Sequence, residues 1–275
     1  MEALEKKQWY RTKWNNLYWP HDIVDPITGK SYLAPSSTGG VGNGTFVGSL
    51  YAPDVWKRIV ESAWKYAEPG IIFIDEVNRH NLLRPVYGDI LTCNPCGEQF
   101  LHSNNACNLG SIDLSKIKSY GNLDEVTMMA VDFLNDVIDV GHWPLPEIDK
   151  MVKDTRPIGL GIMGFADHLI AGQIDYRSET ARTIGANIMK QINHAAWKRS
   201  NYIALADCTF YAQVDDGIRA LYKTKMQGMD LSIYGKARNY QVTTIAPTGT
   251  ISLIAECSSG IEPNFSWAYY RRDSL

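Results

Sequence analysis

Short segments of strand character alternate with stretches of helical periodicity along this chain, and that alternation limits the folds open to it. Residues 71–75 (IIFID) form a continuous apolar run, which is typical of a strand buried on both faces. Residues 241–246 (QVTTIA) are rich in β-branched side chains and predict a second strand. Helical periodicity over 54–67 predicts a helix before the first strand, and that over 123–140 and 178–206 predicts helices between the two strands. This order of elements predicts an α/β fold.

The predicted helices have recognisable ends and apolar positions. Pro144 and Pro146 stop the helix over 123–140, and Ser178 can cap the helix over 178–206. Shorter helices are expected over 147–155 and from Ile251. The recurring apolar positions of the helix over 123–140 are Leu123, Val126, Met129, Ala130, Phe133 and Val137. Those of the helix over 178–206 are Ile184, Ile188, Ile192, Ala195 and Ala196.

Charge and hydropathy narrow the function classes. The 275 residues include 27 Lys and Arg against 30 Asp and Glu, a formal net charge of −3. This balance gives no electrostatic reason to expect a nucleic-acid or anionic-membrane partner. No apolar run approaches the roughly 20 residues of a membrane span, and the first residues lack the apolar region of a secretory signal. We therefore expect a cytoplasmic protein with no membrane partner.

The cysteines give the first sign of chemistry. Cys93, Cys96 and Cys107 fall within 15 residues, whereas Cys208 and Cys257 stand alone and fit small core residues. An odd count in a cytosolic chain indicates reduced thiols. The Cys93-x-x-Cys96 spacing with His102 nearby is compatible with zinc, but a structural zinc site usually pairs two such knuckles. A thiol oxidoreductase that uses Cys93 and Cys96 stays open as an alternative.

Polar residues surround the central cysteine at alternate positions. In an extended segment, Asn94, Cys96 and Glu98 would point to one face. The amide can orient a hydroxyl, the carboxylate can take a proton, and the thiol can act as a nucleophile or a hydrogen-atom carrier. We therefore expect redox or radical chemistry at this face.

Two glycine-containing motifs suggest nucleotide binding. A turn joins the strand over 241–246 to the short helix that follows, and a helix N-terminus with free N–H groups suits phosphate, although an ordinary capped helix has the same pattern. The candidate phosphate ligands are Pro247, Thr248, Gly249, Thr250, Ile251 and Ser252. Residues 159–164 have the form G-x-G-x-x-G, but no strand is evident before them, so a dinucleotide fingerprint is poorly supported.

Several motifs in order resemble one family. Residues 94–99 (NPCGEQ) and 106–112 (ACNLGSI) are similar to the catalytic subunit of ribonucleotide reductase. The resemblance extends, in the family's order, over roughly residues 52–272. Its further motifs are residues 75–79 (DEVNR), 156–167 (RPIGLGIMGFAD), 246–252 (APTGTIS) and 258–263 (SSGIEP). It implies part of a ten-stranded α/β barrel, in which residues 159–164 pack a helix against the barrel.

The resemblance also implies residue roles. Cys96 would carry the thiyl radical that takes the 3′ hydrogen of a ribonucleoside di- or triphosphate. Glu98 would act as a base on the 3′ hydroxyl, and Asn94 would bind the ribose hydroxyls. Cys107 would be one of two thiols that reduce the sugar and end as a disulfide, which a dithiol such as thioredoxin would reduce again. Residues 247–252 would bind the substrate phosphates.

The family pattern implies a division of this chain and a cofactor. Residues 1–51, with a Gly/Ser-rich loop, match poorly, and residues 52–275 would form a partial catalytic barrel. The partner of Cys107 lies on an earlier strand in the family, so we expect the chain to need a complementary N-terminal piece. The ten residues between Cys96 and Cys107 resemble the adenosylcobalamin-dependent branch. Two alternatives to this reductase fragment stay open. One is a large subunit that uses a separate radical subunit, and the other is a non-catalytic remnant that binds a nucleotide or a partner.

Overall fold

The computed structural model describes residues 9–11, 23–24, 31–32, 49–81, 83–117, 119–204, 237–266, 268 and 270. The chain forms two compact units, Met1–Ile72 and Phe73–Leu275. The sequence suggested a division at 51/52, whereas the contacts group the first long helix with the N-terminal residues. Cys208, expected to be a core residue, lies outside the described part of the chain.

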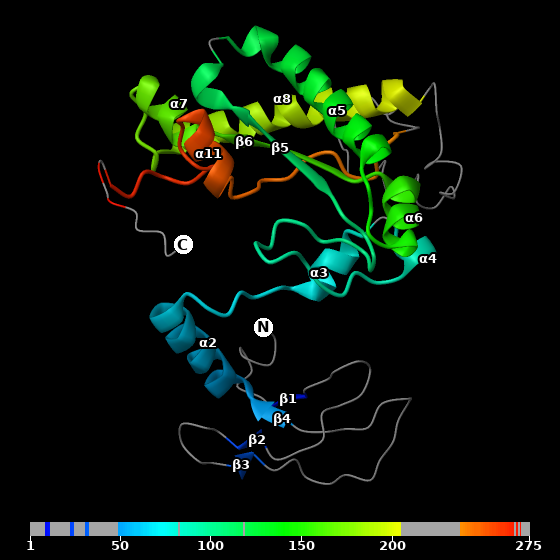
Figure 1. Cartoon of the computed structure of the whole chain (residues 1–275). Helices are drawn as coiled ribbons and strands as arrows, with labels where there is room; N and C mark the ends of the chain where they lie inside the picture. Colours follow the sequence, from blue (N-terminus) through cyan, green and yellow to red (C-terminus); the bar gives the residue numbers. More distant parts are fainter. Residues whose placement is uncertain are drawn as a thin grey trace. The chain divides into compact units, whose positions relative to one another are not determined.

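The described residues of the first unit form two short antiparallel pairs and one helix (Figure 1). Strand β1 (Trp9–Arg11) pairs with β4 (Ser49–Tyr51), and β2 (Ile23–Val24) pairs with β3 (Ser31–Tyr32). Helix α2 (Ala52–Tyr66) follows β4 directly and confirms the helix predicted from residue 54.

The second unit is built from helices around a parallel sheet. Helices α3 (Ile74–Arg79) and α4 (Arg84–Tyr87) precede the loop that carries the clustered cysteines. The described elements after that loop are β5 (Asn108–Asp113), the 3-10 turns η1 (Leu114–Lys116) and η2 (Tyr120–Asn122), α5 (Leu123–Val140), α6 (Pro146–Thr155), β6 (Ile158–Met163), α7 (Phe165–Ala171), α8 (Glu179–Ala204) and α11 (Gly249–Ala255).

Strand β6 is the centre of the sheet. It pairs in parallel with β5, from Asn108 opposite Ile158 to Asp113 opposite Met163. On its other edge, Leu160 N donates to Val242 O (3.0 Å) and Thr244 N donates to Leu160 O (3.1 Å). The segment predicted as a strand at 241–246 therefore runs parallel to β6. Because β6 runs from Ile158 to Met163, the glycine-rich stretch over 159–164 is mostly strand. All six residues of β6 are buried.

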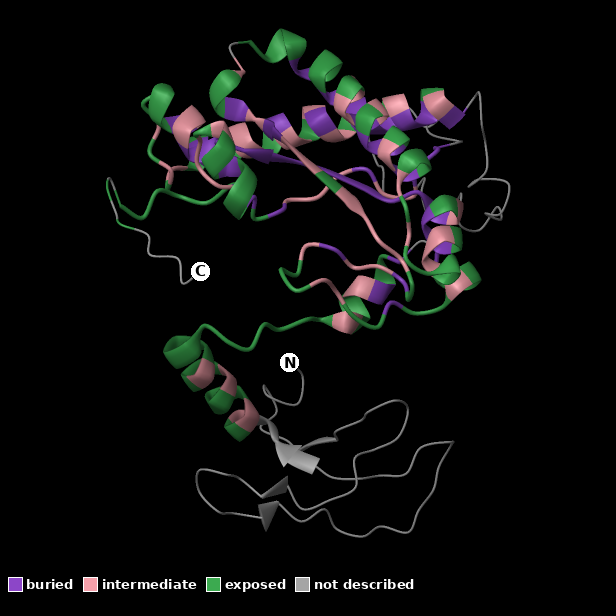
Figure 2. Cartoon of the chain, viewed as in Figure 1, coloured by how far each residue is buried: buried purple, intermediate pink, exposed green. Residues whose placement is uncertain are grey.

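Helices α5 and α8 pack against each other and cover one face of this sheet (Figures 1 and 2). The side chain of Leu134 on α5 lies over Gly110 of β5. Thr243 Oγ1 donates to Asn193 Oδ1 of α8 (3.2 Å), so Thr243 points to the helix face. The buried core between these layers includes Val131, Leu134, Ile138, Ile158, Leu160, Ile162, Ile188 and Ile192.

The strand predicted at 71–75 is not formed. Residues 71–73 are irregular, α3 begins at Ile74, and the side chains of Ile71 and Phe73 are 46% and 58% exposed. A strand buried on both faces needs pairing on its edges to satisfy its N–H and C=O groups. No strand in the described part of the chain pairs with this run.

Helix α5 has the predicted bounds but buries a different row of side chains. The predicted positions Met129 and Phe133 are 66% and 69% exposed. The buried residues are Leu123, Thr127, Val131, Leu134, Asn135 and Ile138. Both rows repeat every three or four residues, so the period predicts the helix without choosing its buried face. In α8, by contrast, Ile188, Ile192, Ala195 and Ala196 are buried as predicted.

A buried arginine at the end of α6 fixes the helix layer. Arg156 is 2% exposed and takes a left-handed backbone conformation with φ of 48°. Its guanidinium donates to Asn135 Oδ1 (3.1 Å), to Asn135 O (2.9 Å) and to both carboxylate oxygens of Asp139 (2.6 and 2.8 Å). The side chain of Asn239 donates to Arg156 O (2.9 Å). Arg156 thereby joins α5, the start of β6 and the segment that leads to residue 241.

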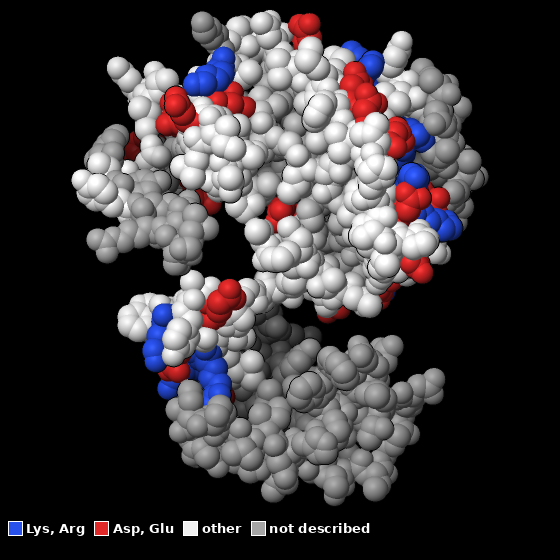
Figure 3. All heavy atoms as spheres, viewed as in Figure 1, with Lys and Arg blue, Asp and Glu red and all other residues white. Residues whose placement is uncertain are grey.

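Charged side chains are mixed over the visible face of the second unit (Figure 3). On α6, Lys150 pairs with Asp154 and Lys153 pairs with Asp149 at i,i+4 spacing. Such exposed pairs contribute little to stability. In the described part of the chain, no helix combines the length and apolarity that a bilayer crossing requires.

Candidate active site

The thiol loop, defined as residues 91–107, contains a tight turn. Asn94 Oδ1 accepts from Gly97 N (3.1 Å) and Gln99 N (2.9 Å), and Asn94 N donates to Gln99 O (3.1 Å). Asn, Pro and Gly at the first, second and fourth positions are typical of a type I turn, and Gly97 has a positive φ of 81°. The prediction of an extended segment here is therefore wrong, and Asn94, Cys96 and Glu98 do not lie at alternate positions of a strand.

The turn presents Cys96 and engages Asn94. Cys96 occupies the third turn position and is exposed, whereas Cys93 is half-buried. The amide oxygen of Asn94 is occupied by its own turn, which leaves its Nδ2 group for a ligand. The structure thus gives Asn94 a structural task that the sequence did not suggest.

Glu98 and Gln99 are attached to the segment over 241–244. Thr244 Oγ1 donates to the backbone oxygen of Glu98 (3.0 Å), and Gln241 Nε2 donates to Gln99 Oε1 (2.6 Å). The carboxylate atom Oε2 of Glu98 is buried and has no hydrogen-bond partner among the described residues. A buried carboxylate oxygen without a partner is costly unless a ligand or a proton serves it. Glu98 therefore has a buried acceptor atom that is open to a donor.

Cys107 lies at the far end of the same loop, just before β5. Its thiol donates to Asn108 O (3.3 Å). Burial raises the pKa of Cys107 to about 12, and the negative charge of Glu98 adds to the shift. Cys107 therefore stays protonated at neutral pH. Two predicted site residues, Glu98 and Cys107, lie close enough to interact electrostatically. The four described cysteines, Cys93, Cys96, Cys107 and Cys257, are all free.

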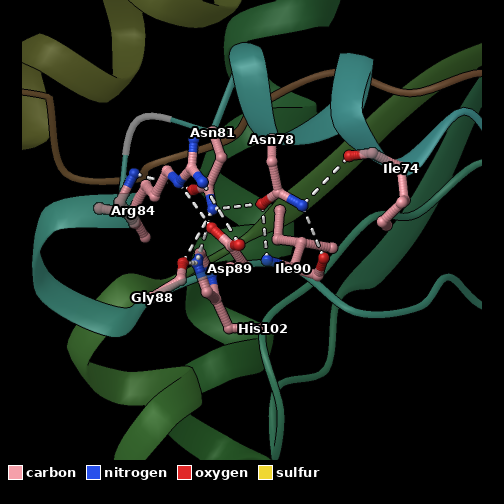
Figure 4. Close-up of polar contacts among 9 residues, drawn as sticks. Ile74, Asn78, Asn81, Arg84, Gly88, Asp89, Ile90 and His102 are labelled. Atoms are coloured by element: carbon pink, nitrogen blue, oxygen red, sulfur yellow. Dashed lines mark hydrogen bonds and ion pairs between the residues drawn. The ribbon is translucent and has the colours of Figure 1, made fainter. Parts of the chain in front are cut away.

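A buried polar network holds the loop against α3 and α4 (Figure 4). Asn78 donates to Ile90 O (2.8 Å) and accepts from Ile90 N (2.8 Å). Asn81 Nδ2 donates to Gly88 O (3.0 Å) and lies 3.2 Å from His102 Nε2, which also contacts Gly88 O (3.2 Å). Burial lowers the pKa of His102, so the ring is neutral here.

The predicted phosphate segment forms the start of α11. Thr248 has a φ of 58°, and its Oγ1 accepts from Gly260 N (2.7 Å). The Ser252 hydroxyl shares a hydrogen bond with Ser259 (2.8 Å). These two hydroxyls hold the loop after α11, and that loop contacts the start of α7 through Ser258 and Asp167 (2.6 Å). The exposed residues at this helix start are Pro247, Gly249, Thr250 and Ile251.

The segment over 241–246 therefore connects the thiol loop to the predicted phosphate segment. The segment over 241–246 contacts the thiol loop at one end and leads into the predicted phosphate segment at the other. The sequence did not single out Gln241 or Thr244, and it suggested His102 only as a neighbour of a possible zinc site. Gln241 and Thr244 belong to a predicted strand. Only a prediction that the thiol loop lies beside this strand would have identified them as site residues.

Comparisons with known proteins point to one family. A profile of the family "Ribonucleotide reductase, barrel domain" matches residues 41–274. A vitamin B12-dependent ribonucleoside-diphosphate reductase from Thermoplasma acidophilum is 44% identical over 228 residues, which are 81% of this chain and 28% of that protein. The reductase of the same name from Mycobacterium tuberculosis is 38% identical over 256 residues, which are 91% of this chain and 33% of that protein.

A solved structure supports the fold. The alpha subunit of the class Id ribonucleotide reductase from Actinobacillus ureae superposes with a TM-score of 0.64 at 22% identity, over 80% of this chain and 41% of that one. The chain spans about a third of the length of the curated relatives above. The expected α/β barrel class is confirmed, and because the family profile covers most of its residues, the chain belongs to the ribonucleotide reductase barrel-domain family.

Proposed function

We propose that this chain carries the radical-thiol site of a ribonucleotide reductase, which converts ribonucleoside diphosphates to 2′-deoxyribonucleotides. The observation that carries the proposal is the thiol loop. It presents Cys96 at the exposed tip of a turn and holds Glu98, with its buried and unpartnered carboxylate oxygen, near the half-buried Cys107. The diphosphate is favoured because two relatives are named for it.

Each side chain of the loop has a distinct chemical task in this proposal. A sulfur radical on Cys96 takes the 3′ hydrogen, so that an S–H bond forms as the C3′–H bond breaks. Glu98 accepts the proton of the 3′ hydroxyl while water leaves from C2′. Asn94 Nδ2 donates to a ribose hydroxyl. Cys107 and a second thiol supply two electrons and two protons, become a disulfide, and leave the 3′ hydrogen to return from Cys96.

The protonation state of Cys107 suits that task. Its pKa of about 12 keeps it a thiol, which carries the proton that the sugar needs. The second thiol and the strands that complete the barrel are expected in the part of the reductase that this chain does not span. We propose that a complementary N-terminal piece supplies them and that a dithiol such as thioredoxin reduces the disulfide.

We propose adenosylcobalamin as the radical source, because the relatives are named as vitamin B12-dependent and the ten-residue gap fits that branch. The exposed Cys96 thiol fits a bound group that must reach its sulfur. When bound, that cofactor supplies the one-electron chemistry that side chains cannot start. Cys96 is the residue we assign to face it. A cytoplasmic location stays a prediction.

The phosphates of the substrate are proposed to lie at the start of α11. The backbone N–H groups of Gly249, Thr250 and Ile251 precede the first intrahelical bond, which Ser252 N makes to Thr248 O (2.9 Å). Apart from the chain neighbours and the helix's own backbone, no atom of the described residues lies within 4 Å of the position of a Cβ on Gly249, so an anion can approach the backbone there.

The test is product formation by the reductase that contains this chain together with the remaining length found in its relatives. With a ribonucleoside diphosphate, adenosylcobalamin and a dithiol, we expect 2′-deoxyribonucleotide. Cys96→Ser should abolish it, and Glu98→Gln should slow it by roughly 10²–10⁴-fold, the usual contribution of a general base. Cys93→Ser is the matched control and should retain activity.

Two results would redirect the proposal. If Cys93→Ser is as inactive as Cys96→Ser, and the two cysteines form a disulfide during turnover, the thiol-oxidoreductase alternative is favoured. If activity requires an added radical-generating subunit rather than adenosylcobalamin, the chain belongs to the branch with a separate radical subunit.

A further inference from the structure

The first two glycines of the G-x-G-x-x-G motif, Gly159 and Gly161, lie beneath the contact between the thiol loop and the segment over 241–246. A Cβ on Gly159 would lie 2.8 Å from Gln99 Nε2 and 2.8 Å from Thr244 Cγ2, and a Cβ on Gly161 would lie 2.3 Å from Thr244 O. Both glycines are buried in β6. Without side chains there, the loop and the segment over 241–246 can meet directly above the central strand.

Only one of the two adjacent threonines of the segment over 241–246 contacts the thiol loop. Successive side chains of an extended segment point to opposite faces, so Thr243 and Thr244 are directed oppositely. Thr243 donates to Asn193 on α8, whereas Thr244 donates to the backbone oxygen of Glu98. The chain reaches the predicted phosphate segment at Pro247, three residues after Thr244.

We propose that Thr244 is a positioning residue for Glu98, which couples the carboxylate to the strand that ends at the substrate phosphates. The inference rests on the proposed function. Because Oε2 of Glu98 has no partner among the described residues, the carboxylate is not fixed by its own hydrogen bonds, and its place is set by the backbone that Thr244 holds. Gln241 supports the same attachment through Gln99.

The experiment uses three substitutions at the paired threonines. Thr244→Val keeps the shape and removes the hydroxyl, Thr244→Ser keeps the hydroxyl, and Thr243→Val is the control on the opposite face. The first measurement is hydrogen exchange in the turn over 94–99 of this chain. We expect Thr244→Val to speed exchange there by about two- to tenfold, the range for loss of one hydrogen bond, with Thr244→Ser and Thr243→Val within about twofold of wild type.

The second measurement is steady-state turnover by the reductase that contains this chain and its remaining length. Thr244→Val should lower kcat by about tenfold, a part of the general-base contribution, while KM stays within about twofold. Thr244→Ser should restore kcat. An unchanged kcat in Thr244→Val, or equal effects of Thr243→Val and Thr244→Val on exchange, overturns the proposal.

The two claims fail in different ways. If the proposed function is wrong, Cys96→Ser leaves the activity intact, whatever the exchange measurement gives. If only the role of Thr244 is wrong, Cys96→Ser and Glu98→Gln lose activity as expected, but Thr244→Val behaves like Thr243→Val.

Discussion

Replacement of Gly161 by alanine tests the close packing of β6 against the segment over 241–246. The new Cβ would lie 2.3 Å from Thr244 O, where an ordinary contact is about 3.4 Å, so the backbone of that segment has to move by about 1 Å. Such a movement takes the bonds of Leu160 N to Val242 O (3.0 Å) and Thr244 N to Leu160 O (3.1 Å) past hydrogen-bond length.

The cost follows from these contacts. Two hydrogen bonds contribute about 1 kcal/mol each, and overpacking of a core costs about 1–3 kcal/mol. We therefore expect Gly161→Ala to lower the free energy of unfolding by about 3 to 5 kcal/mol.

Urea denaturation of the whole chain, followed by tryptophan fluorescence, measures this loss. Gly249→Ala is the control, because no described residue outside its own helix and chain neighbours comes within 4 Å of its Cβ position. Alanine also favours the helix, so we expect a change of less than about 1 kcal/mol. A loss of less than about 1 kcal/mol in Gly161→Ala would refute the packing described for β6.

Three further predictions concern buried groups. Arg156→Met removes four hydrogen bonds to Asn135 and to half-exposed Asp139, and urea denaturation should show a loss of about 3 kcal/mol; less than about 1 kcal/mol would contradict it. Burial lowers the pKa of His102 from 6.5, so the unfolded chain binds more protons, and stability should fall as the pH drops below about 6.5. His102→Gln should reduce this slope, and an identical slope would argue against it. With its pKa of about 12, Cys107 should be alkylated by iodoacetamide at pH 7.5 far more slowly than exposed Cys96, as peptide mass spectrometry can measure; equal rates would contradict this.

The helices were predictable because their signals are local. Periodicity and flanking residues gave the bounds of α5, and Ser178 accepts from Ala181 N (3.1 Å) at the start of α8 as expected. The buried face of α5 was not predictable, because the row with Thr127 and Asn135 looks less apolar than the exposed one. Asn135 is buried because it serves Arg156, which is 21 residues away in the sequence.

The residues of the candidate site could be named from the sequence, but their geometry could not. Cys96, Glu98 and Cys107 do lie on one loop, yet the turn signal of residues 94–97 was read as extended chain. The strand expected at 71–75 depended on partners that a hydropathy pattern does not reveal. The roles of Gln241 and Thr244 come from side-chain contacts across more than 140 residues of sequence.

The central claim is that Cys96 takes the 3′ hydrogen while Cys107 supplies reducing electrons. The most direct measurement is release of tritium from a 3′-labelled ribonucleoside diphosphate by the reductase that contains this chain. Serine cannot carry the radical, so Cys96→Ser should release no label, whereas Cys107→Ser should still release it and then stall with loss of the base. Release by Cys96→Ser, or its absence in Cys107→Ser alone, would contradict the assignment.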